Sequence, residues 1–273
     1  MTLAHSFVGP GDARRTIVLV HGLLASGRNL RSLARALTEA LPDTRALLVD
    51  LPGHGDSSKL GESDRVISVR GCADAVAALL QTTQSNVHTV IGHSFGGKVA
   101  LLLAHQLAGC ERVWTLDTRL DTDPNWRGQS DVATVMAALR SVPVPAADRK
   151  AVATALADHG LSDRVAEWLT TNLKRSDAGF TWVFDFDQIE GLTDDYFHLD
   201  AIAFLEARGF GPDVHLLRAE NGDRWTPHAL ARVEALSQSQ SDARVHCHVL
   251  TDAGHWVHAD NLPGLLKLLL ESP

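Results

Sequence analysis

The chain has 273 residues, of which 45% are hydrophobic and 21% charged, and its formal net charge is −8. This size and composition fit one large globular domain, or a core domain with an insertion. The acidic balance argues against binding to nucleic acid or to an anionic membrane surface. No apolar run approaches the roughly 18 to 20 residues that span a bilayer.

The N-terminus and the cysteines bear on the compartment. The first 15 residues, MTLAHSFVGPGDARR, lack the apolar core of a secretory signal. Cys72, Cys110 and Cys247 are odd in number and form no CxxC pair, which argues against a disulfide framework or a zinc site. We therefore expect a soluble intracellular protein, cytoplasmic, or organellar if a transit peptide has been removed.

Strand-like and helical patterns alternate through the first part of the chain. Short apolar runs predict buried strands over 16–20, 45–50, 87–91 and 113–116. Apolar residues at helical spacing predict helices over about 30–41, 63–81 and 95–108. This alternation predicts a mostly parallel sheet with helices on both faces and functional groups at the carboxyl ends of the strands. Those ends carry His21-Gly22, Asp50, Ser94 and Asp117.

The alternation breaks between residues 120 and 211. This segment contains three short helical patterns, around 132–139, 147–157 and 162–173, and five aromatic residues, Trp126, Trp168, Trp182, Phe184 and Phe186. We interpret it as a helical cap inserted after the strand that follows the 95–108 helix. The sheet then resumes with a strand at 214–217, a helix at 227–236, a strand at 245–250 and a last helix at 263–270. The expected division is a core of residues 1–119 and 212–273 and a cap of residues 120–211.

The stretch from Val87 to Val99 reads VHTVIGHSFGGKV and contains G-x-S-x-G between a strand and a helix. This is the pattern of a nucleophile elbow, in which Ser94 projects from a very tight turn. Side chains at Gly92 and Gly96 would collide across such a turn. The helix that follows directs its N-terminal amides at the serine, which favours developing negative charge. A plain glycine-rich turn is the alternative interpretation, and the rest of the chain favours the elbow.

A serine hydroxyl becomes a good nucleophile only when a base takes its proton. The base is normally a histidine that is oriented by a carboxylate. His255 follows the last predicted strand, where a hydrolase of this topology places its catalytic histidine. Two carboxylates compete for the acid. Asp223 follows the strand at 214–217, whereas Asp117 follows the strand before it. The spacing alone leaves both open.

The remaining site residues follow from the same topology. The amides of Leu23 and Phe95 are the candidate oxyanion-hole donors. We expect His21, Gly22, His93 and Trp256 to contact the substrate, with Gly22 allowing close approach of the backbone. His258 is interpreted as a surface or supporting group, and residues 52–55 as a scaffold turn.

Metal and cofactor chemistry find no support in the sequence. His246 and His248 share one face of the last strand but have no acidic or cysteine partner at ligand spacing, so we interpret them as a structural pair. The chain has no G-x-G-x-x-G after its first strand and no Walker lysine pattern. We expect neither a metal nor a cofactor.

Four stretches, HGLLASGRNL, DLPGHGDSS, GHSFGGKVA and DAGHWVHAD, together resemble the α/β-hydrolase superfamily. More narrowly, they are similar to abhydrolase-domain-containing protein 11 and the bacterial YbfF-type esterases. The resemblance implies an α/β-hydrolase fold with a helical cap, Ser94 as nucleophile and His255 as base. In this subgroup the acid tends to occupy the position of Asp117, but this sequence also has Asp223.

The resemblance further implies a serine carboxylesterase or thioesterase that takes small acyl esters or thioesters through an acyl-serine intermediate. In such an enzyme we expect the aromatic residues of the cap to line an apolar pocket for the acyl group. One alternative is a C–C bond hydrolase or a menaquinone-pathway-type lyase on the same triad, although such lyases more often carry tyrosine where His93 stands. Another is a non-catalytic ligand receptor on a hydrolase scaffold.

Overall fold

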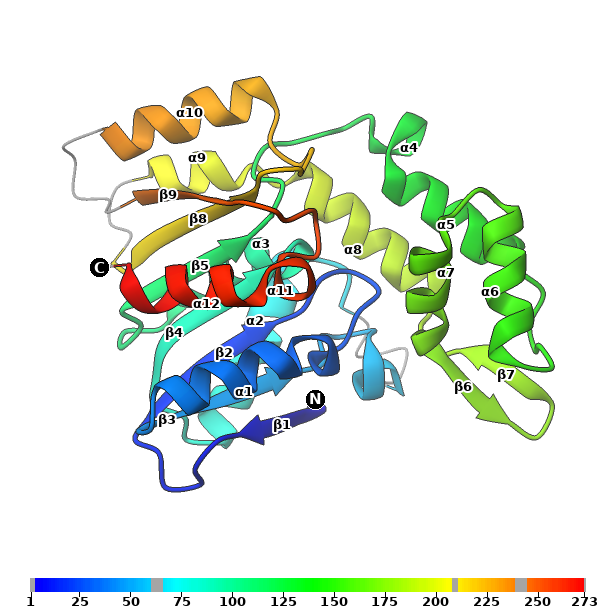
Figure 1. The fold of residues 1–273 in the computed structure, drawn as a ribbon, viewed down its shortest axis with the longest axis horizontal. Coiled ribbons are helices and arrows are strands. Elements are labelled where there is room, and N and C mark those ends of the chain that lie inside the picture. Colours follow the sequence, from blue (N-terminus) through cyan, green and yellow to red (C-terminus); the bar gives the residue numbers. More distant parts are fainter. Residues whose placement is uncertain (1–2, 60–65, 208–210, 239–244, 273) are drawn as a thin grey trace.

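The fold is known from a computed structural model that describes residues 3–59, 66–207, 211–238 and 245–272. Its main feature is a seven-stranded sheet with the strand order β1-β3-β2-β4-β5-β8-β9 (Figure 1). All neighbouring strands are parallel except the edge pair β1 and β3. The strands are β1 (His5–Val8), β2 (Arg15–Val20), β3 (Thr44–Val49), β4 (Val87–His93), β5 (Arg112–Leu116), β8 (Asp213–Ala219) and β9 (Val245–Leu250).

The predicted α/β fold with a mostly parallel sheet is confirmed. Each apolar run predicted as a strand forms one, because parallel strands covered on both faces bury nearly every side chain. The sequence analysis did not find β1. This four-residue strand lies at the sheet edge with alternately exposed side chains, so it has no apolar run to identify it.

Helices cover both faces of the sheet (Figure 1). The buried side chains of α1 (Arg31–Ala40) and α12 (Leu262–Glu271) form one hydrophobic cluster with the sheet. Those of α2 (Val69–Thr82), α3 (Phe95–Gln106) and α10 (Pro227–Gln238) belong to a second cluster. The short helical turns near the site are η1 (Gly27–Leu30), η2 (Gly55–Lys59) and α11 (Val257–Asp260).

The start of α2 differs from the prediction. The apolar spacing predicted a helix from about residue 63, but residues 60–65 lie outside the described part and α2 begins at Val69. Ser68 has extended backbone angles, and its side chain accepts a hydrogen bond from the Gly71 amide. A serine in this conformation is an N-cap, which defines the first turn of the helix.

The segment between β5 and β8 is mainly helical, as predicted. The patterns at 132–139 and 147–157 form helices, whereas the third ends early and continues into a short hairpin. The hairpin and the longest helix of the segment, α8, were not predicted. The elements are α4 (Trp126–Gln129), α5 (Asp131–Ser141), α6 (Arg149–Asp158), α7 (Asp163–Leu169), η4 (Thr170–Asn172), β6 (Leu173–Ser176), β7 (Gly179–Trp182), α8 (Phe186–His198) and α9 (Ala201–Glu206).

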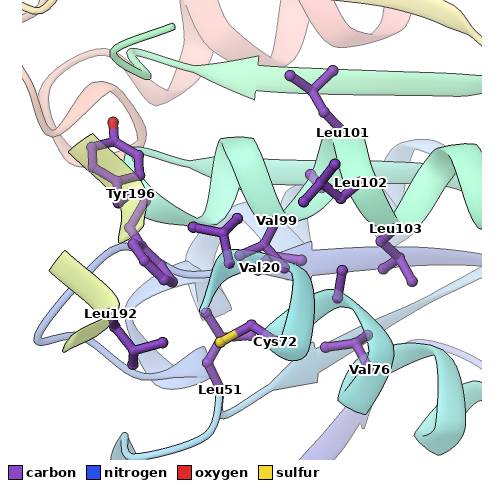
Figure 2. Close-up of a cluster of buried hydrophobic side chains, with 14 of the residues drawn as sticks. Val20, Leu51, Cys72, Val76, Val99, Leu101, Leu102, Leu103, Leu192 and Tyr196 are labelled. Carbon is purple, nitrogen blue, oxygen red and sulfur yellow. The ribbon is translucent and has the colours of Figure 1, made fainter. Parts of the chain in front are cut away.

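The hydrophobic core continues from the sheet helices into this segment. Figure 2 shows Leu192 of α8 beside Leu51 and Cys72, and these three residues and Tyr196 of the same helix belong to one buried cluster. We keep the name cap for residues 120–211, and their separation from the core as a domain stays a prediction. Within the described residues, every helix is too short or too polar to cross a bilayer.

Candidate active site

Ser94 stands between β4 and α3 with backbone angles of φ 52° and ψ −119°. A positive φ is unfavourable for a residue with a side chain, and such strain is often found at functional sites. The two flanking glycines permit the turn. A Cβ atom at Gly92 would collide with the Gly96 carbonyl, and one at Gly96 would collide with the carbonyls of Val20 and His21. The local geometry is therefore that of a nucleophile elbow.

His255 is oriented by Asp117. The Asp117 Oδ2 atom lies 2.7 Å from His255 Nδ1, and the aspartate side chain is 1% exposed. The other carboxylate oxygen, Oδ1, accepts the Ala219 amide at 2.9 Å. Asp117 itself has φ 47° at the end of β5, and its amide donates to the Leu217 carbonyl. The acid is thus fixed by backbone contacts from β8 and has its second oxygen directed at the imidazole.

Asp223 is placed differently. Its side chain is 74% exposed, and its Oδ1 lies 3.3 Å from the Nε atom of Arg224. It does not line the cavity that contains Ser94 and His255. Of the two carboxylates that the sequence left open, the structure brings only Asp117 to His255.

Ser94 and His255 line one cavity of about 420 Å³. Most of the residues predicted around it lie on its wall: His21, Gly22, Leu23, His93 and Trp256. Phe95 does not line it, because its side chain is buried in the core and only its amide faces the elbow as the first N–H of α3. No hydrogen bond joins Ser94 to His255 among the described residues, and such bonds commonly tighten only when substrate is bound.

The cap provides the opposite wall of the cavity. It contributes mostly aliphatic side chains, from α5, α7 and the loop between α6 and α7, whereas the sequence analysis expected aromatic ones. Of the five predicted aromatic residues, only Trp168 lines the cavity, where it packs near Trp256 with ring centroids 5.8 Å apart. The apolar cap residues on the wall are Val132, Val135, Leu161, Val165, Trp168 and Phe197.

His21 and His93 are held by backbone groups. His21 Nε2 accepts the Leu51 amide at 3.0 Å, and its Nδ1 lies 2.7 Å from the Gly22 carbonyl, so His21 joins the loop that carries Leu23 to the loop after β3. Burial lowers the pKa of His21 to about 4. His93 Nε2 donates to the His255 carbonyl at 2.7 Å. Burial, and next the nearby His258 and His255, lower the pKa of His93 well below its usual value, so it is neutral.

His258, which the sequence placed at the surface or in support, lines the cavity. Its ring packs edge-on against His93 with centroids 4.9 Å apart. Burial, with a contribution from His255, lowers the pKa of His258 to about 4. His258 is therefore neutral near neutral pH and does not compete with the predicted base, His255, for a proton.

Arg119, Tyr196 and Arg224 are among the cavity residues that were not predicted. Arg119 lies two residues after Asp117 and Arg224 one residue after Asp223, so their positions after the carboxyl ends of strands were a usable signal. The Tyr196 hydroxyl accepts the Arg119 amide and donates to the Arg119 carbonyl, and its ring packs on Phe95 with centroids 5.6 Å apart. No motif marks a tyrosine in the last turn of a helix that was not itself predicted.

Lys98, in the first turn of α3, is fully buried. Its ammonium donates to the carbonyls of Asp121, Tyr196 and Leu199 at 3.2, 2.8 and 2.6 Å, and so joins the elbow helix to both ends of the cap. Burial lowers the pKa of Lys98 to about 7, against the opposing effect of Asp121.

The other polar clusters lie away from the cavity. His246 and His248 share a face of β9, as predicted, and stack with His215, which in turn stacks on Trp114. Among the described residues, no group of three histidine, cysteine or acidic side chains is placed to hold a metal ion. Asp50 accepts the amides of Gly27 and Asp56, which gives it a scaffold role in the loops beside the site.

Comparisons with known proteins found relatives that match nearly the whole chain. The chain is 31% identical over 261 residues to the sn-1-specific diacylglycerol lipase ABHD11 of Mus musculus, across 92% of this chain and 78% of the mouse protein. It is 28% identical over 254 residues to the esterase YbfF of Escherichia coli (strain K12), across 93% of this chain and 91% of YbfF. A solved marine microorganism esterase shares the fold with a TM-score of 0.80 at 21% identity, over 99% of this chain and 98% of that one.

These relatives are esterases and lipases, which indicates a hydrolase acting on ester bonds. The family model that matches, described as the alpha/beta hydrolase family, spans residues 17–263. That range begins in β2 and ends in α12, so it takes in the elbow, the cap and the histidine loop. The chain belongs to the alpha/beta hydrolase family.

Proposed function

We propose that this protein is a serine hydrolase that cleaves small carboxylic esters or thioesters through an acyl-serine intermediate. Ser94 Oγ attacks the acyl carbon while His255 Nε2 takes its proton. Asp117 accepts the Nδ1–H of His255, which fixes the tautomer and stabilises the imidazolium that forms. The amides of Leu23 and Phe95 donate to the oxyanion of the tetrahedral intermediate.

The second half of the reaction uses the same groups. The imidazolium of His255 protonates the departing alcohol or thiol as the acyl-serine forms. Water then enters, gives a proton to His255 and attacks the acyl carbon, and the second tetrahedral intermediate releases the acid and the Ser94 hydroxyl. The proton transfers and bond changes of both half-reactions balance with Ser94, His255 and water alone.

One observation carries this proposal: a buried carboxylate 2.7 Å from the imidazole of a histidine that shares a cavity with a strained serine. A histidine with only a structural role in a surface loop would not require a buried carboxylate partner. The partner of His255 is Asp117, which is 1% exposed and is fixed by two backbone hydrogen bonds. The apolar cap wall supports an acyl chain as the part of the substrate bound there.

The test is hydrolysis of p-nitrophenyl butyrate by the wild type and by Ser94→Ala, with Ser85→Ala as the matched control. We expect Ser94→Ala to lose at least 10³-fold in kcat, since removing a triad member leaves only the oxyanion hole and binding. Retained turnover in Ser94→Ala would refute the proposal. Labelling of Ser94 by a fluorophosphonate with no turnover of any ester would instead indicate a ligand receptor.

A further inference from the structure

Two arginines line the catalytic cavity, and the mechanism uses neither. Arg119 follows Asp117 by two residues, and Arg224 lies in the loop after β8. Their side chains are 20% and 23% exposed, so both are largely removed from bulk water. Among the described residues that form the cavity wall, they are the only lysine or arginine side chains. The single acidic residue on that wall is Asp131, whose side chain is 72% exposed.

Four carboxylates contact the two guanidinium groups, three of them from outside the cavity. Arg119 places Nε 3.2 Å from Asp121 Oδ1 and Nη1 3.5 Å from Asp123 Oδ2. Arg224 places Nε 3.3 Å from Asp223 Oδ1, and these three carboxylates do not line the cavity. The fourth is the exposed Asp131 on the cavity wall, whose Oδ2 lies 3.4 Å from Arg224 Nη2. These ion pairs fix where the two cations lie.

The ion pairs leave most of the arginine donors unsatisfied. A guanidinium has five N–H donors. The Nε atoms of Arg119 and Arg224 are both buried without a hydrogen bond, because their nearest carboxylates are poorly aligned. Among the described residues, the two guanidinium groups together donate one hydrogen bond, from Arg224 Nη2 to Asp131 at 3.4 Å. The Nη groups of both arginines make no other hydrogen bond in the described part of the chain, so an anion in the cavity would accept charge-assisted hydrogen bonds from them.

The two cations are near the predicted reaction centre. Both arginines line the same cavity as Ser94 and His255. Both also act electrostatically on Tyr196, whose ring packs on Phe95, the residue after the nucleophile. The cap side chains on the cavity wall are mostly apolar and include Val135, Val165 and Trp168. A ligand that fills the cavity therefore has an apolar part against the cap and a negatively charged part at the arginines.

We infer that Arg119 and Arg224 bind an anionic group of the substrate, so that the preferred substrate is an ester or thioester carrying a carboxylate or a phosphate beside the bond that is cleaved. This inference rests on the proposed hydrolysis at Ser94. Each arginine donates charge-assisted hydrogen bonds to the anion, and two arginines favour a planar or tetrahedral oxyanion over a neutral polar group.

The experiment compares pairs of esters that differ only in charge. The acyl arm uses the mono-p-nitrophenyl ester of glutarate against its methyl-capped diester. The leaving-group arm uses the butyrate ester of 4-hydroxybenzoate against that of methyl 4-hydroxybenzoate. We expect kcat/KM to favour the anionic member at least 10-fold in one arm, which also shows on which side of the scissile bond the anion lies.

The variants then assign that preference to the arginines. Arg119→Met and Arg224→Met should each lower the anionic-to-neutral ratio of kcat/KM roughly 10- to 100-fold, the effect of losing a charge-assisted hydrogen bond. Arg119→Lys and Arg224→Lys should recover part of the ratio, which a merely structural role would not produce. Arg35→Met, on the exposed side of α1, is the control and should leave the ratio as it is in the wild type.

Two results would overturn the inference. One is a wild-type ratio within twofold of unity in both arms, a measurement that needs no variant to fold. The other is a large ratio that all four arginine variants retain. Both are distinct from failure of the proposed function, in which neither member of any pair is hydrolysed and Ser94→Ala behaves as the wild type does.

Discussion

Replacing Asp117 with asparagine tests how the acid works. Asp117 Oδ1 accepts the Ala219 amide at 2.9 Å, so an asparagine at this position must keep its carbonyl oxygen there. Its NH₂ group then occupies the place of Oδ2, which lies 2.7 Å from His255 Nδ1. A donor at that place forces Nδ1 to accept and moves the ring proton to Nε2. An imidazole with a proton on Nε2 cannot take the proton of Ser94.

The expected loss follows from this change of tautomer. We expect kcat of Asp117→Asn to fall about 10⁴-fold, as it does for the corresponding change in a serine triad, with little change in KM. A factor of 10⁴ corresponds to about 5 kcal/mol of transition-state stabilisation. The assay is p-nitrophenyl butyrate hydrolysis at pH 8, with thermal unfolding to show that the fold is intact.

Asp223→Asn is the matched comparison, since Asp223 is the other carboxylate that the sequence offers for the acid. Its side chain is 74% exposed and contacts Arg224 instead of the imidazole. With a neutral ester we expect kcat within about threefold of the wild type, as for most changes on the surface. A large loss in Asp223→Asn together with a small one in Asp117→Asn would refute the assignment of the acid.

Three further predictions concern the surroundings of the triad. A Cβ at Gly222 would lie 2.8 Å from Asp117 Oδ1, so Gly222→Ala should displace the carboxylate and lower kcat roughly 10-fold or more in steady-state assays, and an unchanged kcat would contradict this. Asn172 donates to the Leu24 carbonyl at 2.8 Å beside the oxyanion loop, so Asn172→Asp should lower kcat about 10-fold, whereas the exposed Thr171→Ala should not. Burial lowers the pKa of His54 from 6.5 to about 3. As pH falls from 6.5 toward 3, the unfolded chain therefore binds a proton at His54 before the folded protein does, and the free energy of unfolding decreases. Urea unfolding should show that His54→Asn loses about 2 kcal/mol less stability than the wild type between pH 6.5 and 4.5, and equal losses would contradict the buried neutral state.

The strands and the turn at Ser94 were predictable from the sequence because they follow local patterns. Apolar runs identify strands buried on both faces, and glycine spacing identifies the turn at Ser94. The edge strand β1 and the helix α8 were missed for the opposite reason. β1 is short and half exposed, and α8 carries three aspartates and a glutamate among its apolar residues. Their stability comes from neighbours that are distant in sequence.

The choice between the two acids could not be made from spacing. Asp117 and Asp223 both follow strands that end at the same edge of the sheet. What separates them is the direction of the Asp117 side chain, which is set by the φ of 47° at Asp117 itself and by an amide of β8 that donates to one carboxylate oxygen. The cavity arginines were missed for a related reason, since no short motif marks a cation whose neighbours come from the cap and from the loop after β8.

An acyl-serine intermediate would leave the acyl group of the substrate on Ser94 during turnover. Wild-type protein is mixed rapidly with excess p-nitrophenyl butyrate, quenched in acid during the first turnover and mapped by peptide mass. We expect a butyryl group on Ser94 and none on that peptide in Ser94→Ala. Hydrolysis that continues in Ser94→Ala, with the acyl group on another residue or on none, would contradict it.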